Sequence, residues 1–207
     1  MNDGAEVRDE TLLRRLADGD EEAFTILYAR HHRPLFRFAL HMTGRVEAAE
    51  EVVQESFMAL LREAGKYDPG RGAPPAFLFG IARNHVRRLL DADGRYLGFP
   101  DEGPGGADSR PAAGFAVHSP DFSGEIERAE LSSQVRRAVF SLPERYREVI
   151  TLCDLEEMDY ERAAAILACP IGTVRSRLNR AREMLAGKLR ALRAVPRPAA
   201  IRATGTE

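Results

Sequence analysis

The segment from residue 91 to residue 124 separates two stretches of the chain that show helical periodicity. It is rich in Gly, Pro, Asp and Ser and has little hydrophobic periodicity, which predicts a flexible, weakly acidic linker. A structureless connection of this length is uncommon inside one compact domain, so the sequence favours two separate domains. We expect these domains at residues 11–90 and 125–194, followed by a disordered tail at residues 195–207.

The first stretch, residues 11–90, repeats hydrophobic residues at the spacing of α-helices. Asp20 is expected to cap a helix that Pro34 kinks and that Gly44 ends. The next helix is predicted to bury one stripe, which consists of Ala49, Val52, Val53, Ser56, Phe57, Leu60, Leu61 and Ala64. No segment alternates hydrophobic and polar residues as a strand does. We therefore expect an all-α fold of two small helical domains.

The second stretch contains a short helix, a tight turn and a longer helix, which is the pattern of a helix-turn-helix. Asp159 is expected to cap the short helix, and Pro143 suits the first position of the helix before it. The longer helix is predicted to bury a stripe formed by Val174, Leu178, Ala181 and Leu185. If Ala168 in the turn is left-handed, alanine costs roughly 1 kcal/mol there relative to glycine.

The longer helix concentrates positive charge in a chain whose net charge is −2. Its polar residues cluster near the helix N-terminus, where a recognition helix meets base edges, and Arg, Asn and Ser can pair with those edges. The predicted contacts to an upstream DNA element are Gly172, Thr173, Arg175, Ser176, Arg177, Asn179 and Arg180. Residues better suited to phosphates are Arg177, Arg182, Lys188, Arg190 and Arg193. The alternative is a solvated basic face on a surface helix.

Several functional classes lack support in the sequence. There is no apolar run of about eighteen residues and no secretory signal, so we expect a cytoplasmic protein. Cys153 and Cys169 lack disulfide or metal spacing and are expected to be reduced, with a redox switch as the alternative. No carboxylate or thiol spacing supports a metal site at His31, His32 and His41. Without a phosphate loop, HExxH or nucleophile elbow, we expect no enzyme, catalytic residue or cofactor.

Two segments resemble those of one known family, the extracytoplasmic-function (ECF) sigma factors. The second stretch resembles their promoter-binding domain in LPERYREVITLCDLEEMDYERAAAILACPIGTVRSRLNRAREML. The first stretch resembles their N-terminal domain in AEEVVQESFMALLREAGKYDPGRGAPPAFLFGIARNHVRRLL. The resemblance implies a dissociable subunit of bacterial RNA polymerase, which binds the core enzyme, recognises two promoter elements and helps to open the DNA in a stress or envelope response.

The resemblance also implies roles for residues of the first domain. Docking on the basic coiled coil of the polymerase clamp is implied for Glu51, Gln54, Glu55 and Phe57. Contact with the downstream promoter element is implied for Arg83, Asn84, Arg87 and Arg88. An asparagine offers both a donor and an acceptor to an extruded base. The linker would span roughly 30 Å as a coil and about 110 Å when extended, whereas elements two helical turns apart are separated by roughly 70 Å.

The implied partners are core RNA polymerase, promoter DNA and an anti-sigma factor, with no small-molecule substrate and a monomer when free of partners. A stand-alone helix-turn-helix regulator is one alternative, and it would bind operators as a symmetric dimer. A sigma mimic that sequesters an anti-sigma factor without contacting DNA is the other. The sequence departs from the family pattern in having no tryptophan. Leu61 and Phe77 stand where the family often has one, and Ala168 stands where glycine is common.

Overall fold

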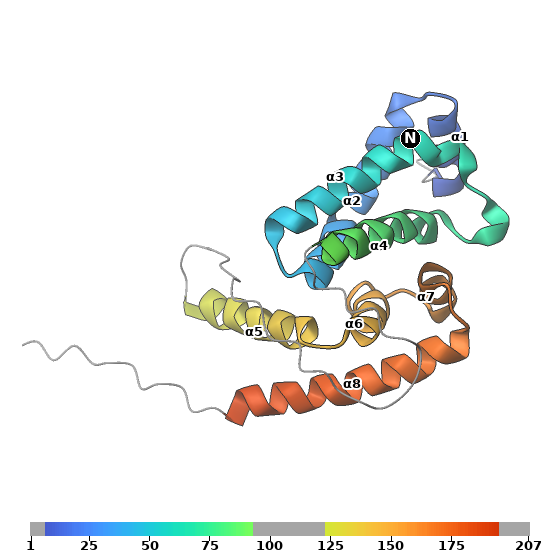
Figure 1. The fold of residues 1–207 in the computed structure, drawn as a ribbon. Coiled ribbons are helices and arrows are strands. Elements are labelled where there is room, and N and C mark those ends of the chain that lie inside the picture. The colour runs from blue at the N-terminus through green and yellow to red at the C-terminus, as the bar shows by residue number, and fades with distance from the viewer. Residues whose placement is uncertain (1–6, 93–122, 195–207) are drawn as a thin grey trace, which may run out of the picture.

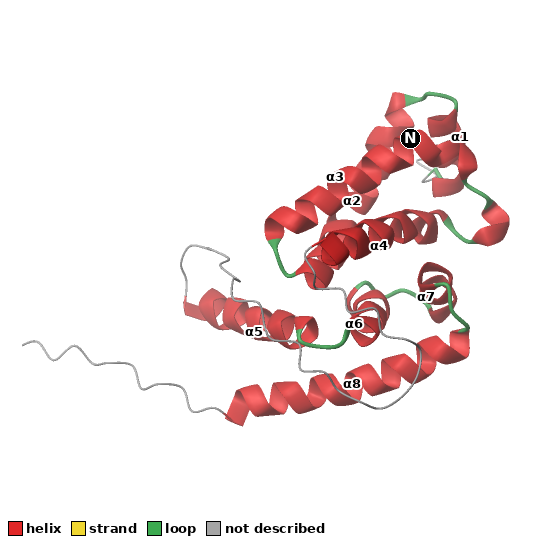
Figure 2. Ribbon diagram, viewed as in Figure 1, coloured by secondary structure: helices red, strands yellow, loops and turns green. Residues whose placement is uncertain are grey.

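The structure is a computed structural model that describes residues 7–92 and 123–194. Every regular element within these ranges is a helix (Figures 1 and 2), which confirms the predicted all-α fold class. The predicted tail and almost all of the predicted linker lie outside the described residues. At the edges of the linker, the adjoining helices extend to Ala92 and begin at Ser123.

The N-terminal domain is a bundle of four α-helices and two short 3-10 turns among the described residues. Its elements are Asp9–Ala17 (α1), Glu21–Thr43 (α2), Val46–Glu63 (α3), the 3-10 turns Ala64–Lys66 (η1) and Pro69–Arg71 (η2), and Pro74–Ala92 (α4). The Asp20 carboxylate accepts hydrogen bonds from the Glu22 and Ala23 amides at 2.9 and 3.2 Å. Gly44 ends α2 with a left-handed φ of 75°. The predicted start and end of α2 are therefore confirmed.

The core of the N-terminal domain lies between α2, α3 and α4. Phe38 and Phe79 are fully buried, and their ring centroids are 5.5 Å apart in an edge-to-face arrangement. The predicted α3 stripe is buried except at Leu61, whose exposed fraction is 44%. Leu61 follows Gln54 by two helical turns and so lies on the polar side of α3. The prediction that Leu61 is buried was therefore wrong.

The C-terminal domain is built around the predicted helix-turn-helix. Its elements are Ser123–Phe140 (α5), Glu144–Ile150 (α6), the π-helical turn Thr151–Leu155 (η3), Tyr160–Leu167 (α7) and Ile171–Ala194 (α8). Asp159 caps α7, because its carboxylate accepts a hydrogen bond from the Arg162 amide at 2.7 Å. Pro143 has a ψ of 143° and precedes α6 as its N-cap, one position before the predicted one. An extended ψ is typical of an N-cap residue, which precedes the helical angles of the first turn.

The two domains contact each other along α4. Figure 1 shows α4 above α6 and α7, with α8 on the opposite side of the C-terminal domain. The α2 helix also contacts α5 and α6, and the buried apolar side chains of both domains form one continuous cluster. A Cβ atom at Gly44 would lie only 2.8 Å from Phe140 Cε2 of α5. Because Gly44 has no side chain, the two domains can pack closely at this point. The same residue can also adopt the left-handed conformation that ends α2.

Ala168 ends α7 in the left-handed conformation, with φ 51° and ψ 46°. Replacing Ala168 with glycine is expected to raise the free energy of unfolding by roughly 1 kcal/mol, because glycine has no Cβ that clashes in this region. The matched control is Ala186→Gly at an exposed position within α8, which is expected to lower the same free energy by roughly 1 kcal/mol. Thermal denaturation followed by circular dichroism measures both. A lower melting temperature for Ala168→Gly would contradict the assignment.

Candidate nucleic-acid interface

The α7–turn–α8 unit holds α8 by one hydrophobic side. The turn is closed by a hydrogen bond from the Cys169 amide to the Ala164 carbonyl at 3.1 Å. Val174, Leu178 and Ala181 are almost completely buried, and Leu185 packs partly buried against the same core. The predicted stripe is thereby confirmed. Because this stripe fixes the rotation of α8 about its own axis, it also decides which residues face outward.

The outward side of α8 carries the predicted contacts to upstream DNA. Exposed members of this set are Gly172, Arg175, Ser176, Asn179 and Arg180, and half-buried members are Thr173 and Arg177. All of them lie in the N-terminal half of α8. The Arg175 guanidinium carbon is 5.8 Å from the centre of the Tyr160 ring, a cation–π contact that orients the side chain and leaves it exposed. The structure therefore brings the whole predicted set together on one helix.

Glu183, which the sequence analysis did not single out, contacts two members of this set. Its carboxylate accepts hydrogen bonds from Asn179 Nδ2 at 3.3 Å and from Arg180 Nη1 at 3.0 Å. Residues three and four positions apart are neighbours on a helix surface, so this spacing was the signal that could have revealed the contact. The three side chains form one polar cluster in which Glu183 restricts the rotamers of Asn179 and Arg180.

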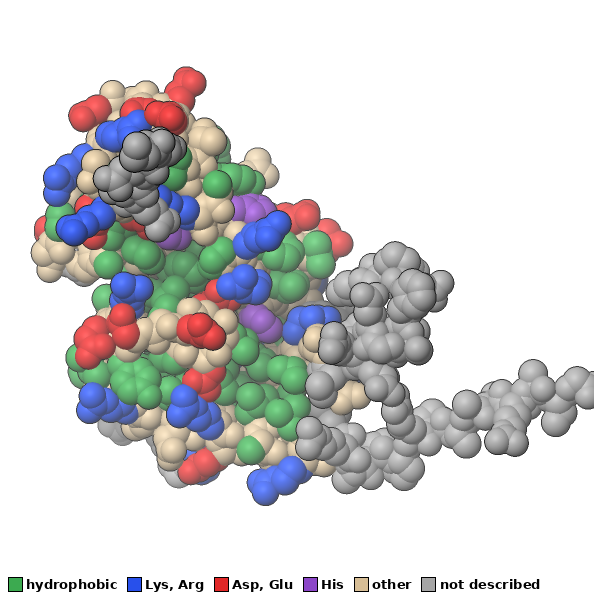
Figure 3. Space-filling view, turned by 180° about the vertical axis from the view of Figure 1, so that it is seen from behind, with side chains coloured by type: hydrophobic (Ala, Val, Ile, Leu, Met, Phe, Trp, Pro, Cys, Tyr) green, Lys and Arg blue, Asp and Glu red, His purple; other side chains and the backbone are tan. Residues whose placement is uncertain are grey.

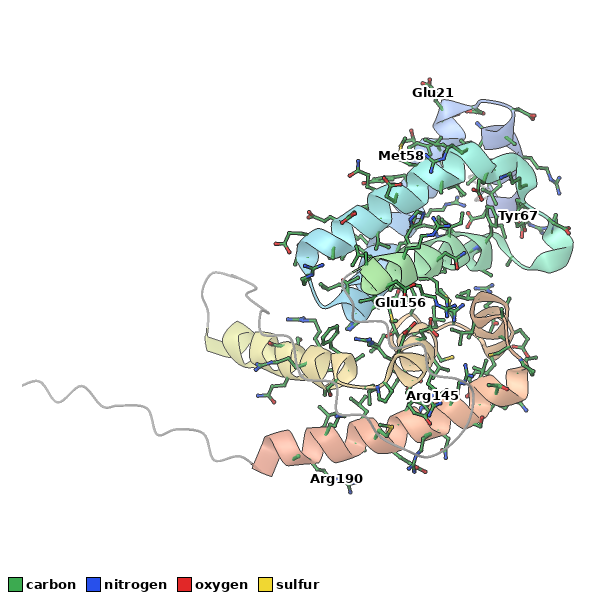
Figure 4. All side chains as sticks on the ribbon, in the orientation of Figure 1. Glu21, Met58, Tyr67, Arg145, Glu156 and Arg190 are labelled. Atoms are coloured by element: carbon green, nitrogen blue, oxygen red, sulfur yellow. The ribbon has the colours of Figure 1, made fainter. Side chains whose placement is uncertain are left out.

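Arg182 has a different partner from the one that the sequence suggested. Its Nε and Nη2 atoms donate to the two carboxylate oxygens of Asp154 at 2.9 and 2.6 Å. These hydrogen bonds raise the pKa of Arg182 above its usual value, and they connect α8 to η3. Arg182 was predicted to suit a phosphate, but in this structure it fastens α8 to its own domain. Arg190, at the far end of α8, is exposed and points away from the domain (Figure 4).

The predicted contacts to downstream DNA lie on α4, and they differ in how far their side chains are exposed. Asn84 and Arg88 are exposed, whereas Arg87 is half-buried. Arg83 is the most enclosed, with 14% of its side chain exposed. Its Nε and Nη2 atoms donate to the two carboxylate oxygens of Glu148 on α6 at 2.5 and 3.2 Å. Because this partner belongs to the other domain, Arg83 faces outward from its own domain.

The outer side of α3 carries the predicted polymerase-docking residues. Glu51, Gln54 and Glu55 are exposed. Phe57 is not, because only 3% of it is accessible; its ring lies 6.0 Å from that of Phe24 and 4.8 Å from that of Tyr28. Phe57 therefore belongs to the buried hydrophobic stripe of α3, and its side chain does not lie on the outer side with the other predicted docking residues. Phe57 supports the helix from inside, and this part of the site prediction is corrected.

Two hydrophobic side chains accompany the acidic residues on the outer side of α3. Met58 and Leu61 have exposed fractions of 45% and 44%, and Figure 4 shows Met58 on the side of α3 away from α4. Both follow Gln54 at helical spacing and so continue the line of Glu51 and Gln54. A face that combines exposed apolar side chains with carboxylates has a composition suited to contact with another protein.

Metal and redox chemistry find little support among the residues that the structure describes. No three His, Cys, Asp or Glu side chains come together there in a way that could hold a metal ion. His31 Nε2 lies 2.6 Å from Asp9 Oδ2, and His41 is largely buried. Cys153 and Cys169 are unpaired and half-buried, and burial raises the pKa of the Cys153 thiol to about 11. At neutral pH such a thiol stays protonated, which makes Cys153 a poor nucleophile.

The exposed side chains of both signs are mixed on the face seen in Figure 3. Within residues 7–92 and 123–194, no helix is both long and apolar enough to cross a membrane. Among the described residues, the basic and polar side of α8 and the acidic side of α3 each gather side chains of one character. They belong to different domains.

Comparisons with known proteins agree with this division. Residues 27–96 match the family model of sigma-70 region 2, and residues 132–185 match that of sigma-70 region 4. The ECF RNA polymerase sigma-E factor of Haemophilus influenzae is 34% identical over 191 residues, which cover 90% of this chain and 98% of the relative.

Two solved structures are similar over most of the chain. CnrH in complex with the cytosolic domain of CnrY has a TM-score of 0.64 and 27% identity, covering 88% of this chain and 97% of CnrH. The sigma factor RpoE in complex with the anti-sigma factor NepR from Bartonella quintana has a TM-score of 0.59 and 26% identity, covering 81% of this chain and 96% of RpoE. Both domains, in the same order, thus have counterparts in sigma factors, and the chain belongs to the family of ECF RNA polymerase sigma factors.

Proposed function

We propose that this protein binds bacterial core RNA polymerase and directs it to promoters that contain two recognition elements. The observation that carries the proposal is the construction of α8. A buried hydrophobic stripe fixes the helix, and the opposite side presents exposed Arg, Asn and Ser residues near the N-terminus. These are the residue types that read base edges in the major groove. Residues 125–194 form the domain that binds the upstream element.

The residues of α8 divide into two roles under this proposal. Thr173, Ser176 and Asn179 contact base edges together with Arg175 and Arg180, whose guanidinium groups can each grip a guanine through two hydrogen bonds. Arg177 and the backbone of Gly172 contact phosphates, which position the helix without reading the sequence. A Cβ at Gly172 would meet nothing within 4 Å, so the phosphate backbone can approach closely there.

Residues 11–90 form the domain that binds the downstream element and the polymerase. On α4, exposed Asn84 contacts an extruded base through its amide, and Arg83, Arg87 and Arg88 contact the adjacent phosphates. On α3, Glu51, Gln54 and Glu55 contact a basic surface of the polymerase, and Met58 and Leu61 supply the apolar part of that interface. Phe57 keeps the helix in place from the core side.

The experiment that tests the docking proposal is gel filtration of the protein with sigma-free core RNA polymerase. The wild-type protein is expected to co-elute with the core enzyme. The Glu51→Lys/Glu55→Lys variant is expected to bind about 10- to 100-fold more weakly, because like charges face each other in the complex. The matched control is Asp18→Lys/Glu21→Lys, which changes the same charge at two exposed positions, one between α1 and α2 and one at the first residue of α2. Equal binding by the docking variant and the wild type would refute this role for α3.

The proposals about an inhibitory partner, cellular location and oligomeric state rest on the similarity to known sigma factors. CnrH and RpoE were solved with CnrY and the anti-sigma factor NepR, respectively, and we extend to this chain an inhibitory protein partner of that kind. The protein acts where RNA polymerase acts, in the cytoplasm. It works as a monomer when free of partners, without a small-molecule substrate, cofactor or catalytic centre. A stand-alone regulator would instead bind specific duplex DNA without polymerase, and a sigma mimic would not support transcription.

A further inference from the structure

Glu183 is the one acidic residue in the sequence of α8, and it lies next to the candidate base contacts of that helix. Its side chain is 55% exposed. A carboxylate on a surface that approaches DNA is repelled by the phosphates, so it lowers affinity for every sequence alike. Figure 1 shows α8 on the side of the C-terminal domain away from α4, and Glu183 bonds to Asn179 and Arg180 of α8 itself. The effect of this acid on DNA recognition therefore depends on contacts along one helix.

The two carboxylate oxygens of Glu183 have different partners. Oε2 accepts a hydrogen bond from Arg180 Nη1 at 3.0 Å, and Oε1 accepts one from Asn179 Nδ2 at 3.3 Å. Residues three and four positions apart are neighbours on a helix surface, so one carboxylate can contact both. The bond to Arg180 joins two charged groups and is the shorter one, so it holds the carboxylate in place. Glu183 is thereby fixed against the amide of Asn179.

The contact with Glu183 decides which end of the Asn179 amide is available to DNA. A carboxylate only accepts hydrogen bonds, so the NH2 end of the amide must turn toward Glu183. The amide oxygen then points away from Glu183, on a side chain that is exposed. One N–H of Nδ2 is used by Glu183, and the other can still donate. Asn179 therefore presents an oxygen acceptor beside a single donor.

We propose that Glu183 is a specificity-determining residue, which orients Asn179 so that its amide oxygen meets a base with an amino group in the major groove. The inference rests on the proposed role of α8 in reading the upstream element. Adenine presents an amino group beside an acceptor nitrogen, which matches both groups of the oriented amide, and cytosine presents an amino group alone. Guanine and thymine present an oxygen in the same place, and that oxygen repels the amide oxygen. Glu183 thus lowers affinity but rejects these two bases.

The test compares the wild type with Glu183→Gln, each in complex with core RNA polymerase, by mapping transcript starts on a promoter library randomised in the upstream element. Glutamine has the same length as glutamate, but its amide can donate or accept, so it no longer fixes the orientation of Asn179. The base pair that Asn179 reads is identified by the loss of preference in Asn179→Ala. There the wild type is expected to prefer adenine or cytosine. Glu183→Gln is expected to lower this preference about 2- to 5-fold, the scale of one exposed charged contact.

A second readout separates this positioning role from a structural one. Glu183→Gln removes a negative charge near the phosphates, so total transcription should be maintained or rise while selectivity falls. A structural defect would instead lower transcription and leave the preferred bases unchanged. In the Asn179→Ala background, Glu183→Gln is expected to have no further effect at this base pair. The matched control is Glu161→Gln at an exposed position on α7, which removes the same charge and should leave every base preference unchanged.

Three outcomes would overturn the inference. The first is an unchanged preference in Asn179→Ala or Glu183→Gln, or an equal loss in Glu161→Gln. The second is a wild-type preference for guanine or thymine at the base pair that Asn179 reads. The third is a further loss when Glu183→Gln is added to Asn179→Ala, because Glu183 would then read the base itself. Failure of the proposed function is recognised separately, since the wild-type protein would then select no upstream element at all.

Discussion

The Arg175→Ala variant is expected to lose selectivity for one base pair of the upstream promoter element. Arg175 is exposed on the N-terminal half of α8 and is oriented by the Tyr160 ring. A bidentate pair between arginine and guanine contributes about 1–3 kcal/mol of discrimination, so the preference for the correct base should fall about 5- to 150-fold. Arg180→Ala is expected to relax selectivity at a neighbouring position. The smaller effect is expected there, because Glu183 already binds Arg180 at 3.0 Å.

The measurement for these variants is transcript-start mapping by core polymerase on a library of promoter sequences. Arg190→Ala is the matched control, because Arg190 is an exposed arginine on the same helix but lies far from its N-terminus. Loss of a phosphate contact lowers affinity about equally for all sequences. Arg190→Ala should therefore reduce transcription without changing the preferred bases. Retained selectivity at every upstream base in both Arg175→Ala and Arg180→Ala would refute their role as base readers.

His41 is expected to make the folded protein lose stability in mildly acidic solution. Burial, with the positive charges of Arg136 and Arg37, lowers the pKa of His41 from 6.5 to about 4. The unfolded chain therefore takes up a proton at a higher pH than the folded chain does. The stability that neutral His41 contributes is fully present above pH 6.5 and is lost as the pH falls toward 4. At pH 5 this loss amounts to about 2 kcal/mol, at 1.36 kcal/mol per pKa unit.

The His41→Leu variant isolates this contribution, because leucine fills a similar volume and does not titrate. Urea denaturation at pH 7 and pH 5 gives the free energy of unfolding of both proteins. The wild type is expected to lose about 2 kcal/mol more than the variant over this interval. Carboxylates and other histidines titrate in both proteins and cancel in the difference. An equal loss in the two proteins would show that His41 is not held neutral by the fold.

Local signals in the sequence predicted the helices and their ends well. Asp20 and Asp159 cap helices as predicted, Gly44 ends α2, and the hydrophobic stripe of α8 is buried. These features depend on hydrogen bonds within one turn or on hydrophobic spacing along one helix, which the sequence records directly. The same spacing placed the candidate DNA contacts of α8 on one exposed side. The left-handed conformation of Ala168 was raised as a condition only, because Ala168 stands where the family often has glycine, and the structure shows it.

Contacts between distant residues could not be predicted in this way. Arg83 and Glu148 are separated by 65 positions, and Arg37 and Glu156 by 119, so no periodicity links them. The sequence favoured two separate domains, whereas the structure shows them in contact along α4. Phe57 shows a different limit. It belongs both to a buried stripe and to a segment with a docking role in the family, and only the packing against Phe24 and Tyr28 decides between them.

The most direct test of the central claim is transcription by the wild-type protein reconstituted with sigma-free core RNA polymerase on the same promoter library. The mapped starts are expected to share two sequence elements separated by about two turns of DNA, and core polymerase alone should not select them. Starts that share no element, or the same starts from core polymerase alone, would contradict the conclusion that this protein directs promoter-specific initiation.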